Sequence, residues 1–204
     1  MIALPSTESL QHAADIVSSG GVIAFRTDTF YGLGADPFNQ GAVEKIKQLK
    51  GREDNKPILI VISDYNHLDR FIISPSTTFQ LLAQRFWPGA LTLIGQAHTE
   101  LPAGITAGTE TVGVRLPKDD RVRQLVRTCG GALTATSANP SHAAPATTAQ
   151  KVQRYFIEGL DLIVDDGEAQ TDRPSTVVDV SQNEPKLIRE GVIPWVEIKT
   201  ALAL

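Results

Sequence analysis

The sequence contains a single cysteine, Cys129, and only four histidines in 204 residues. One cysteine excludes an internal disulfide, and the scattered histidines have no metal-ligand spacing that would suggest a zinc module. Apolar runs such as residues 57–62 fall far short of the ~20 residues that a membrane span needs. The first residues also lack the charged start and apolar core of a secretory signal. We therefore expect a protein of the reducing cytoplasm without membrane contact.

The sequence also has no excess of basic residues. The 23 Asp and Glu residues outnumber the 19 Lys and Arg residues, which gives a formal net charge of -4. This balance argues against a generally basic nucleic-acid-binding surface, although it permits a local basic patch. Hydrophobic residues make up 42% and charged residues 21%, values that are close to globular averages and exclude extended disorder.

Three frequent motifs are absent. No glycine-rich loop ends in Gly-Lys-Ser/Thr, and no Gly-x-Gly-x-x-Gly turn opens a helix. The Gly-x-Ser-x-Gly elbow of serine hydrolases is also missing. These absences disfavour two common nucleotide-binding folds and one common hydrolase architecture.

Apolar residues recur at helical and strand periods along most of the chain. Helices are predicted over residues 7–19, 42–49, 66–71, 78–86, 121–128 and 147–156. Strands are predicted over residues 22–25, 57–62, 90–95, 111–116, 132–136, 160–164, 176–180 and 186–189. Their alternation indicates an α/β domain, and the short polar turn 181–184 predicts an antiparallel hairpin, hence a mixed sheet. No repeat or linker divides the chain.

Two loops suggest a binding function. The first predicted strand is followed by residues 27–34, TDTFYGLG, a loop rich in hydroxyl groups and glycine. Residues 45–56 hold five basic and two acidic residues, and three of the cations, Lys50, Arg52 and Lys56, fall at a helix end or on the following loop. This placement suits a phosphate ligand, because Arg offers a planar fork of donors and Lys a point charge. A solvated charged face is the alternative.

The strand 111–116 alternates strictly and places Thr111, Gly113 and Arg115 on one face. The missing side chain at Gly113 predicts a groove for a ligand. The alternative is an exposed sheet face whose arginine pairs with a surface carboxylate. Residues 133–140 run from a strand into a turn dense in small hydroxyl and amide groups, which fits either a ligand or ordinary turn chemistry.

Together these segments resemble the YrdC/TsaC family, the threonylcarbamoyl-AMP synthases that supply an intermediate for modifying the adenosine beside certain tRNA anticodons. The resemblance rests on residues 20–26, 27–33, 50–52, 56–57, 86–89, 112–117, 137–139, 175–179 and 188–191. Each motif is modest alone, but their order and spacing over nearly the whole chain are specific.

The resemblance implies one α/β domain over residues 1–204, with a twisted, mixed parallel and antiparallel sheet and flanking helices around a concave cleft. It implies a nucleotidyltransferase that converts L-threonine, bicarbonate or CO2, and ATP with Mg2+ into threonylcarbamoyl-AMP and pyrophosphate. The product would pass to a tRNA threonylcarbamoyltransferase.

The resemblance also assigns roles residue by residue. The implied ATP-binding residues are Lys50, Arg52, Lys56, Thr111, Ser137, Asn139 and Arg189. The implied threonine-binding residues are Thr29, Arg115, Thr134, Ala135 and Ser175. Lys50 and Arg52 are the catalytic candidates, and no side chain is assigned as a metal ligand.

The chain departs from the family pattern in two places. The loop that commonly begins Pro-Thr-Glu reads Arg26-Thr27-Asp28, and His142 stands in a stretch that usually contains glycine. Two other functions remain open: a noncatalytic RNA-binding or ribosome-associated module that uses the basic cleft, and an O-carbamoyltransferase-like enzyme. We expect pyrophosphate release that needs both threonine and bicarbonate to separate all three.

Overall fold

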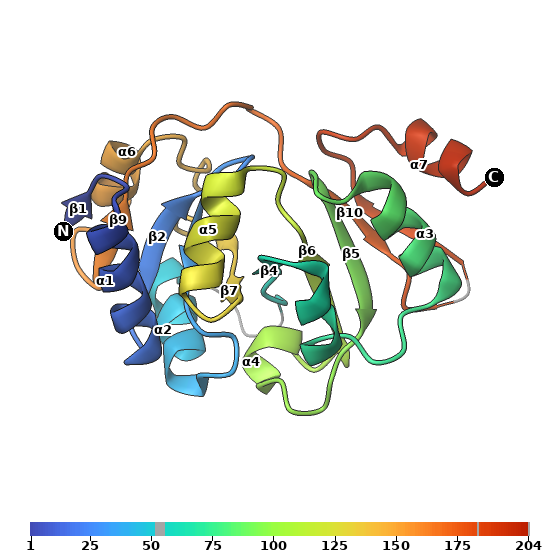
Figure 1. The fold of residues 1–204 in the computed structure, drawn as a ribbon, viewed down its shortest axis with the longest axis horizontal. Helices are drawn as coiled ribbons and strands as arrows, with labels where there is room; N and C mark the ends of the chain where they lie inside the picture. The colour runs from blue at the N-terminus through green and yellow to red at the C-terminus, as the bar shows by residue number, and fades with distance from the viewer. Residues whose placement is uncertain (52–55, 183, 204) are drawn as a thin grey trace.

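The computed structural model describes residues 1–51, 56–182 and 184–203. The strands of this part of the chain form two sheets (Figure 1). The first sheet has the order β1 (Ile2–Ala3), β9 (Leu162–Val164), β2 (Ile23–Arg26), β3 (Tyr31–Gly34), β8 (Thr136–Ser137). The second has the order β11 (Lys186–Arg189), β10 (Thr176–Asp179), β5 (Leu91–Gln96), β6 (Thr111–Arg115), β4 (Ile60–Ile62), β7 (Ala132–Thr134).

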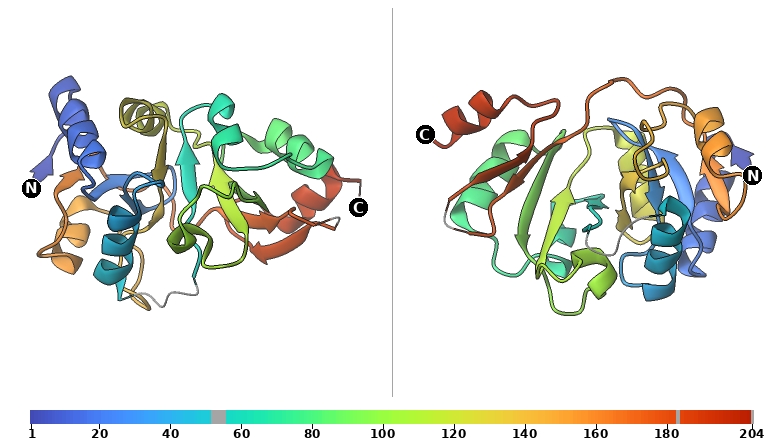
Figure 2. Two further views of the ribbon diagram at one scale, coloured as in Figure 1. Left: turned by 90° about the horizontal axis from the view of Figure 1, so that it is seen from below. Right: turned by 180° about the vertical axis from the view of Figure 1, so that it is seen from behind.

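Both sheets mix parallel and antiparallel pairs, as the sequence predicts. In the first, β2 pairs in parallel with β9 and antiparallel with β3. In the second, β10 pairs in parallel with β5 and forms the predicted antiparallel hairpin with β11. Figures 1 and 2 place the first sheet nearer the N-terminus and the second nearer the C-terminus, with the termini at opposite ends of the molecule.

The division into two sheets was not predicted, and residues 132–136 take part in both of them. The predicted single strand breaks at Ala135, so that β7 pairs with β4 while β8 pairs with β3. At the break, the Ala135 amide donates to the Leu59 carbonyl at 2.7 Å, and the Thr134 amide donates to the Ala35 carbonyl at 3.0 Å. The Thr134 hydroxyl accepts from the Ala35 amide at 2.9 Å and donates to the Leu33 carbonyl at 3.1 Å, which ties the two sheets together.

Within the described residues, the chain passes between the sheets three times. The passages lie between β3 and β4, at Ala135 between β7 and β8, and over residues 165–175 between β9 and β10. Figure 1 shows the third passage, in orange, crossing from the side of β9 to β10. Each passage brings polar backbone to the place where the sheets meet.

The helices flank the sheets. They are α1 (Thr7–Ser18), α2 (Gln40–Lys50), α3 (Thr77–Phe86), α4 (Ala103–Thr106), α5 (Asp120–Thr128), α6 (Ala149–Tyr155), α7 (Trp195–Ala201) and the 3-10 helix η1 (Tyr65–Arg70). Six of them lie within two residues of a predicted helix, but those at residues 103–106 and 195–201 were not predicted. Ser6 caps α1 by accepting from the Ser9 amide, and Gly51 ends α2 at φ 55°. None of the described helices has the length and apolarity to cross a membrane.

The packing is built from two apolar clusters. The larger includes Tyr31, Phe71 and Phe79, all fully buried. The smaller contains Phe25 and Val126, where α5 packs against α1, β4 and β7. Helix α5 therefore packs on α1 and on two strands of the second sheet. It begins just after β6, and the ion pair between Asp119 and Arg26 places its N-terminus close to the end of β2.

Candidate active site

A cavity of about 450 Å³ lies where the sheets meet, which is within the size range of small-molecule sites. Its lining comes from all three passages between the sheets. The lining residues are Thr27, Thr29, Phe30, Tyr31, Gly32, Pro57, Leu59, Ile60, Val61, Thr92, Arg115, Ala135, Thr136, Ser137, Pro145, Asp172, Pro174, Ser175 and Arg189. The wall thus combines apolar side chains with hydroxyl groups, two guanidinium groups and one carboxylate.

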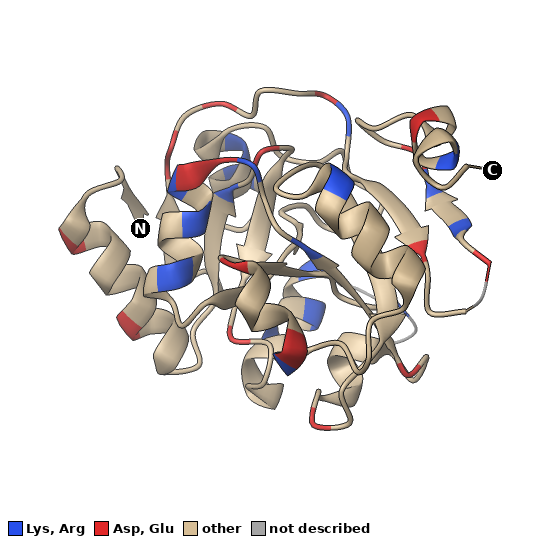
Figure 3. Cartoon of the chain, turned by 45° about the vertical axis from the view of Figure 1, so that its right-hand side comes forward, with Lys and Arg blue, Asp and Glu red and all other residues tan. Residues whose placement is uncertain are grey.

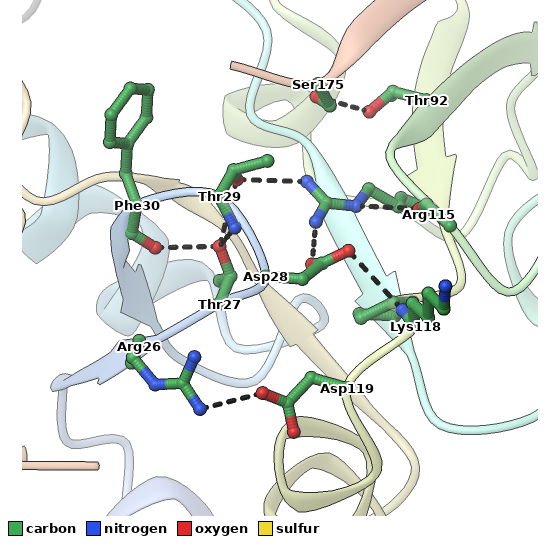
Figure 4. Close-up of polar contacts among 12 residues, drawn as sticks. Arg26, Thr27, Asp28, Thr29, Phe30, Thr92, Arg115, Lys118, Asp119 and Ser175 are labelled. Carbon is green, nitrogen blue, oxygen red and sulfur yellow. Dashed lines mark hydrogen bonds and ion pairs between the residues drawn. The ribbon is translucent and has the colours of Figure 1, made fainter. Parts of the chain in front are cut away.

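The turn between β2 and β3 presents hydroxyl groups to this cavity. The sequence predicts a loop over residues 27–34, but residues 31–34 form β3, because the turn closes after four residues. The Thr27 hydroxyl donates to the Phe30 carbonyl at 2.7 Å and accepts from the Thr29 amide at 3.1 Å (Figure 4). The Thr27 and Thr29 hydroxyls are 3.0 Å apart. This network fixes the Thr29 hydroxyl at the cavity wall.

Arg115, at the end of β6, is buried and held from three sides (Figure 4). Its Nε donates to the Gly89 carbonyl at 3.2 Å, its Nη1 donates to the Thr29 hydroxyl at 3.2 Å, and its Nη2 forms an ion pair with Asp28. Burial and the nearby charge of Arg189 lower the pKa of Arg115 to about 9, so the group remains cationic at pH 7.

The space beside Gly113 is filled by protein. A Cβ atom at Gly113 would lie 2.4 Å from the Leu59 side chain and 3.2 Å from that of Thr92. The predicted ligand groove at this position is therefore wrong. Glycine is needed there so that Leu59 can pack across β6, and Leu59 in turn forms part of the cavity wall.

A second group of polar side chains lies at the β10–β11 strand pair and consists of Ser175, just before β10, and Arg189, at the end of β11. The Ser175 hydroxyl lies 3.0 Å from the Thr92 hydroxyl, and Arg189 donates to the Ser175 carbonyl at 3.0 Å and to its hydroxyl at 3.2 Å. Burial lowers the pKa of Arg189. Gly191 allows this arrangement, because a Cβ atom there would lie 2.1 Å from the Pro174 carbonyl.

Lys50 is buried at the end of α2 and faces the 137–139 segment. Its ammonium group donates to the Ser137 carbonyl and, at 2.7 Å, to the Asn139 carbonyl. The Ser141 amide donates to the Lys50 carbonyl at 2.8 Å. The alternative of a solvated charged face therefore does not hold for Lys50, because its charge is buried and holds a turn in place.

Asn139 organises the turn that follows. Its side-chain amide donates to the carbonyls of Pro140 and Ala143, both at 2.8 Å, while its buried Oδ1 has no hydrogen-bond partner among the described residues. His142, in the same turn, has φ 70°, in the left-handed region where side chains with a Cβ are strained. The position where the family pattern has glycine thus requires the backbone conformation that glycine adopts most readily.

We expect His142→Gly to raise the free energy of unfolding by about 1 kcal/mol, because glycine removes the left-handed strain at an exposed side chain. Denaturant unfolding measures the change. Ala143→Gly is the matched control, since residue 143 is not in the left-handed region, and this change should lower stability slightly. Equal effects of both substitutions would contradict the explanation.

The structure brings together one part of the predicted site. The cavity-lining residues predicted from the sequence are Thr29, Arg115, Ala135, Ser137, Ser175 and Arg189. Three other predicted residues are not in the lining but form hydrogen bonds to segments next to it: Lys50, Thr134 and Asn139. Thr111 lies at the other end of β6, where its hydroxyl is 2.9 Å from that of Thr109. Lys56 is exposed just ahead of Pro57, and Arg52 lies outside the described residues.

Sequence reasoning missed several wall residues, among them Phe30, Thr92 and Asp172. Thr92 could have been found as a lone hydroxyl within the apolar strand β5. Asp172 is the one carboxylate among the described lining residues, and it stands in a passage whose sequence carries no motif.

Comparison with known proteins assigns the family. The sequence model of the Sua5_yciO_yrdC family, described as telomere recombination, matches residues 15–191. The chain belongs to this family. It is 35% identical over 190 residues to a threonylcarbamoyl-AMP synthase of Pyrococcus abyssi, covering 93% of this chain but 56% of that protein. It is 39% identical over 163 residues to a threonylcarbamoyl-AMP synthase of Thiobacillus denitrificans, covering 79% of this chain and 86% of that protein.

A solved family structure agrees in fold. The crystal structure of Pyrococcus abyssi Sua5 complexed with L-threonine superposes with a TM-score of 0.95 at 32% identity. The match covers 99% of this chain and 61% of that one. The present chain therefore spans somewhat more than half of the length of these Pyrococcus relatives, and most of the length of the Thiobacillus relative.

Proposed function

We propose that this protein is a threonylcarbamoyl-AMP synthase, which makes threonylcarbamoyl-AMP and pyrophosphate from L-threonine, bicarbonate or CO2, and ATP. The observation that carries the proposal is the cavity, which combines a buried guanidinium with threonine and serine hydroxyls in a chain of this family. The two relatives named above are both called threonylcarbamoyl-AMP synthases.

The amino acid would bind at the Arg115 end of the cavity. An arginine pairs with a carboxylate through two parallel hydrogen bonds, and Arg115 is the deepest cation of the lining. The hydroxyls of Thr29 and Ser175 would bind the polar groups of threonine, with Ala135 beside them. Thr134 supports this side through its bonds between the two sheets.

The nucleotide would bind toward Ser137 and Arg189. Arg189 supplies a second guanidinium at the wall, and Ser137 supplies a hydroxyl next to the turn that Asn139 and Lys50 hold. Lys56 and Arg52 would reach the phosphates from the segment between α2 and β4. Thr111 would take part only with a part of the nucleotide that extends beyond the cavity, since it lies at the far end of β6.

The reaction needs positioning and charge stabilisation more than covalent help from the protein. The amine of threonine adds to CO2, forming a carbon–nitrogen bond and releasing a proton, and an oxygen of the resulting carbamate attacks the α-phosphorus of ATP. The bond from the α-phosphorus to the bridging oxygen breaks, and pyrophosphate leaves with its electron pair. Fixed cations stabilise the negative charge that develops on the leaving group, and the cavity holds the reactants in line.

Mg2+ would arrive with ATP. It prefers oxygen ligands and retains several waters, so phosphate oxygens and water would supply most of its coordination. The described cavity lining offers one carboxylate, Asp172, which fits such a loosely held ion. The ion supplies neutralisation of phosphate charge.

The product would serve a tRNA threonylcarbamoyltransferase in the cytoplasm. The rival RNA-binding function has less support, because the net charge is -4 and the basic and acidic residues are interspersed along the chain in the cartoon of Figure 3. A continuous basic surface would be needed to follow an RNA backbone. The O-carbamoyltransferase alternative would use a different carbamoyl donor.

We expect purified protein supplied with ATP, L-threonine, bicarbonate and Mg2+ to release pyrophosphate and to form threonylcarbamoyl-AMP, detected by mass spectrometry. Omission of threonine or of the carbon source should abolish both. Absence of the adduct from folded protein with all substrates would refute the proposal. Turnover that depends instead on a carbamoyl donor, or RNA binding without any turnover, would favour the respective alternative.

A further inference from the structure

Two ion pairs join residues 26–28 to residues 115–119, and each segment supplies the cation of one pair and the anion of the other (Figure 4). Arg26 Nη2 lies 2.7 Å from Asp119 Oδ2, and Arg115 Nη2 pairs with Asp28. The pairs fasten the start of the β2–β3 turn onto the connection between β6 and α5, and that connection follows the strand that carries Arg115.

Arg26 is an unusual member of this set. Its side chain is 5% exposed, and it also contacts Asp166, just after β9, at 2.7 Å. Burial lowers the pKa of Arg26, but the carboxylates of Asp166 and Asp119 outweigh that effect and raise it. Its Nε and Nη1 groups are buried and have no hydrogen-bond partner among the described residues. A buried charge is costly unless it is paired, so both carboxylates must stay close to it.

Arg26 does not belong to the described lining of the cavity, whereas Thr27, Thr29 and Arg115 do. It can therefore act on a ligand only through other residues. Asp119 caps α5 by accepting from the Arg121 amide at 2.9 Å, so Arg26 holds the N-terminus of this helix against the end of β2. The Thr29 hydroxyl and the Arg115 guanidinium, 3.2 Å apart, lie on the two segments that this attachment joins.

We propose that Arg26 is a positioning residue for the amino-acid end of the cavity, holding Thr29 and Arg115 in register through Asp119. The ligand identity rests on the proposed function. A substrate carboxylate that binds Arg115 competes with Asp28 and weakens one of the two ion pairs. The pair between Arg26 and Asp119 then remains to hold the turn, so it matters more with the amino acid bound than without it.

The test is calorimetric titration of L-threonine and, separately, of ATP into Arg26→Met and Asp119→Asn. We expect the Kd for L-threonine to rise about tenfold in both variants and the Kd for ATP to stay within about twofold. Asparagine remains a good N-cap, so Asp119→Asn breaks the pair without removing the cap of α5. Arg26→Lys, which keeps the charge, should recover most of the threonine affinity.

Arg121→Met is the matched control. Arg121 contacts Asp166 at 2.8 Å in the same cluster, but its side chain is 73% exposed, and its ion pair joins it to Asp166 rather than to the Arg26–Asp119 or Arg115–Asp28 pairs. Its removal should leave both affinities unchanged. Equal losses of threonine and ATP affinity in Arg26→Met, or an unchanged threonine affinity in Asp119→Asn, would overturn the proposal.

Two further outcomes remain decisive. If Arg26→Met does not fold, Asp119→Asn and Arg26→Lys decide by the same criteria. Wild-type protein that binds no L-threonine would overturn the proposed function together with this inference, whereas wild-type binding with unaffected variants would overturn the inference alone.

Discussion

Arg115→Ala is expected to weaken L-threonine binding by about 30-fold or more while changing ATP binding far less. Loss of a charge-assisted pair with a carboxylate in a partly desolvated site costs about 2 to 5 kcal/mol, and each 1.4 kcal/mol is about a factor of ten in Kd. The hydrogen bonds to Gly89 and Thr29 hold the guanidinium rigidly, so little ordering entropy opposes binding. Calorimetric titration of each ligand measures both affinities.

The same substitution should also lower stability, because the Asp28 carboxylate, 15% exposed, loses its ion-pair partner. We expect a loss of about 2 to 3 kcal/mol, less than for a fully buried pair. The double variant Arg115→Ala with Asp28→Asn should recover stability but not threonine affinity. Persistence of threonine binding with collapse of ATP binding would show that Arg115 belongs to the nucleotide end.

Lys50→Met is expected to lower the free energy of unfolding by about 2 to 3 kcal/mol, because hydrogen bonds from a charged group are stronger than neutral ones and two carbonyls would lose their donor. For a chain of this length, the melting temperature should fall by roughly 4 to 12 °C. The 137–139 turn would loosen, so ATP affinity should fall as well. Thermal unfolding and ATP titration provide the two measurements.

Lys45→Met is the matched control on the same helix. Lys45 contacts Asp161 at 2.8 Å, but both side chains are more than a third exposed, so its removal should change stability by less than about 1 kcal/mol. An unchanged melting temperature in Lys50→Met with lost turnover would restore the original hypothesis, in which the ammonium binds phosphate directly.

Local signals predicted the local structure well. The apolar spacing within residues 7–19 and 42–49 predicted helices there, and the structure confirms them as α1 and α2. The alternation of residues 111–115 correctly placed Arg115 away from the apolar face. It could not show that Thr111 and Arg115, separated by four residues at ~3.3 Å each, reach different parts of the molecule.

The sequence could not reveal features that depend on distant partners. Strand β3 exists because Tyr31 to Gly34 pair with β2 on one side and β8 on the other, and the glycines in it gave no strand signal. The role of Lys50 depends on carbonyls about ninety residues later in the chain. Likewise, the space at Gly113 is filled by Leu59, which comes from the segment just before β4.

The three passages between the sheets also bear on synthesis at the ribosome. The cavity takes Pro57 from the first passage, Ala135 from the second and Pro174 from the third, followed by Ser175 and Arg189 from the last hairpin. A nascent chain that has emerged only as far as β9 contains all five strands of the first sheet, but it still lacks β10 and β11, the strand pair that completes the second sheet and the cavity wall. Such a chain has no complete place to hold its ligands, so they can stabilise the protein only after β10 and β11 have joined the second sheet.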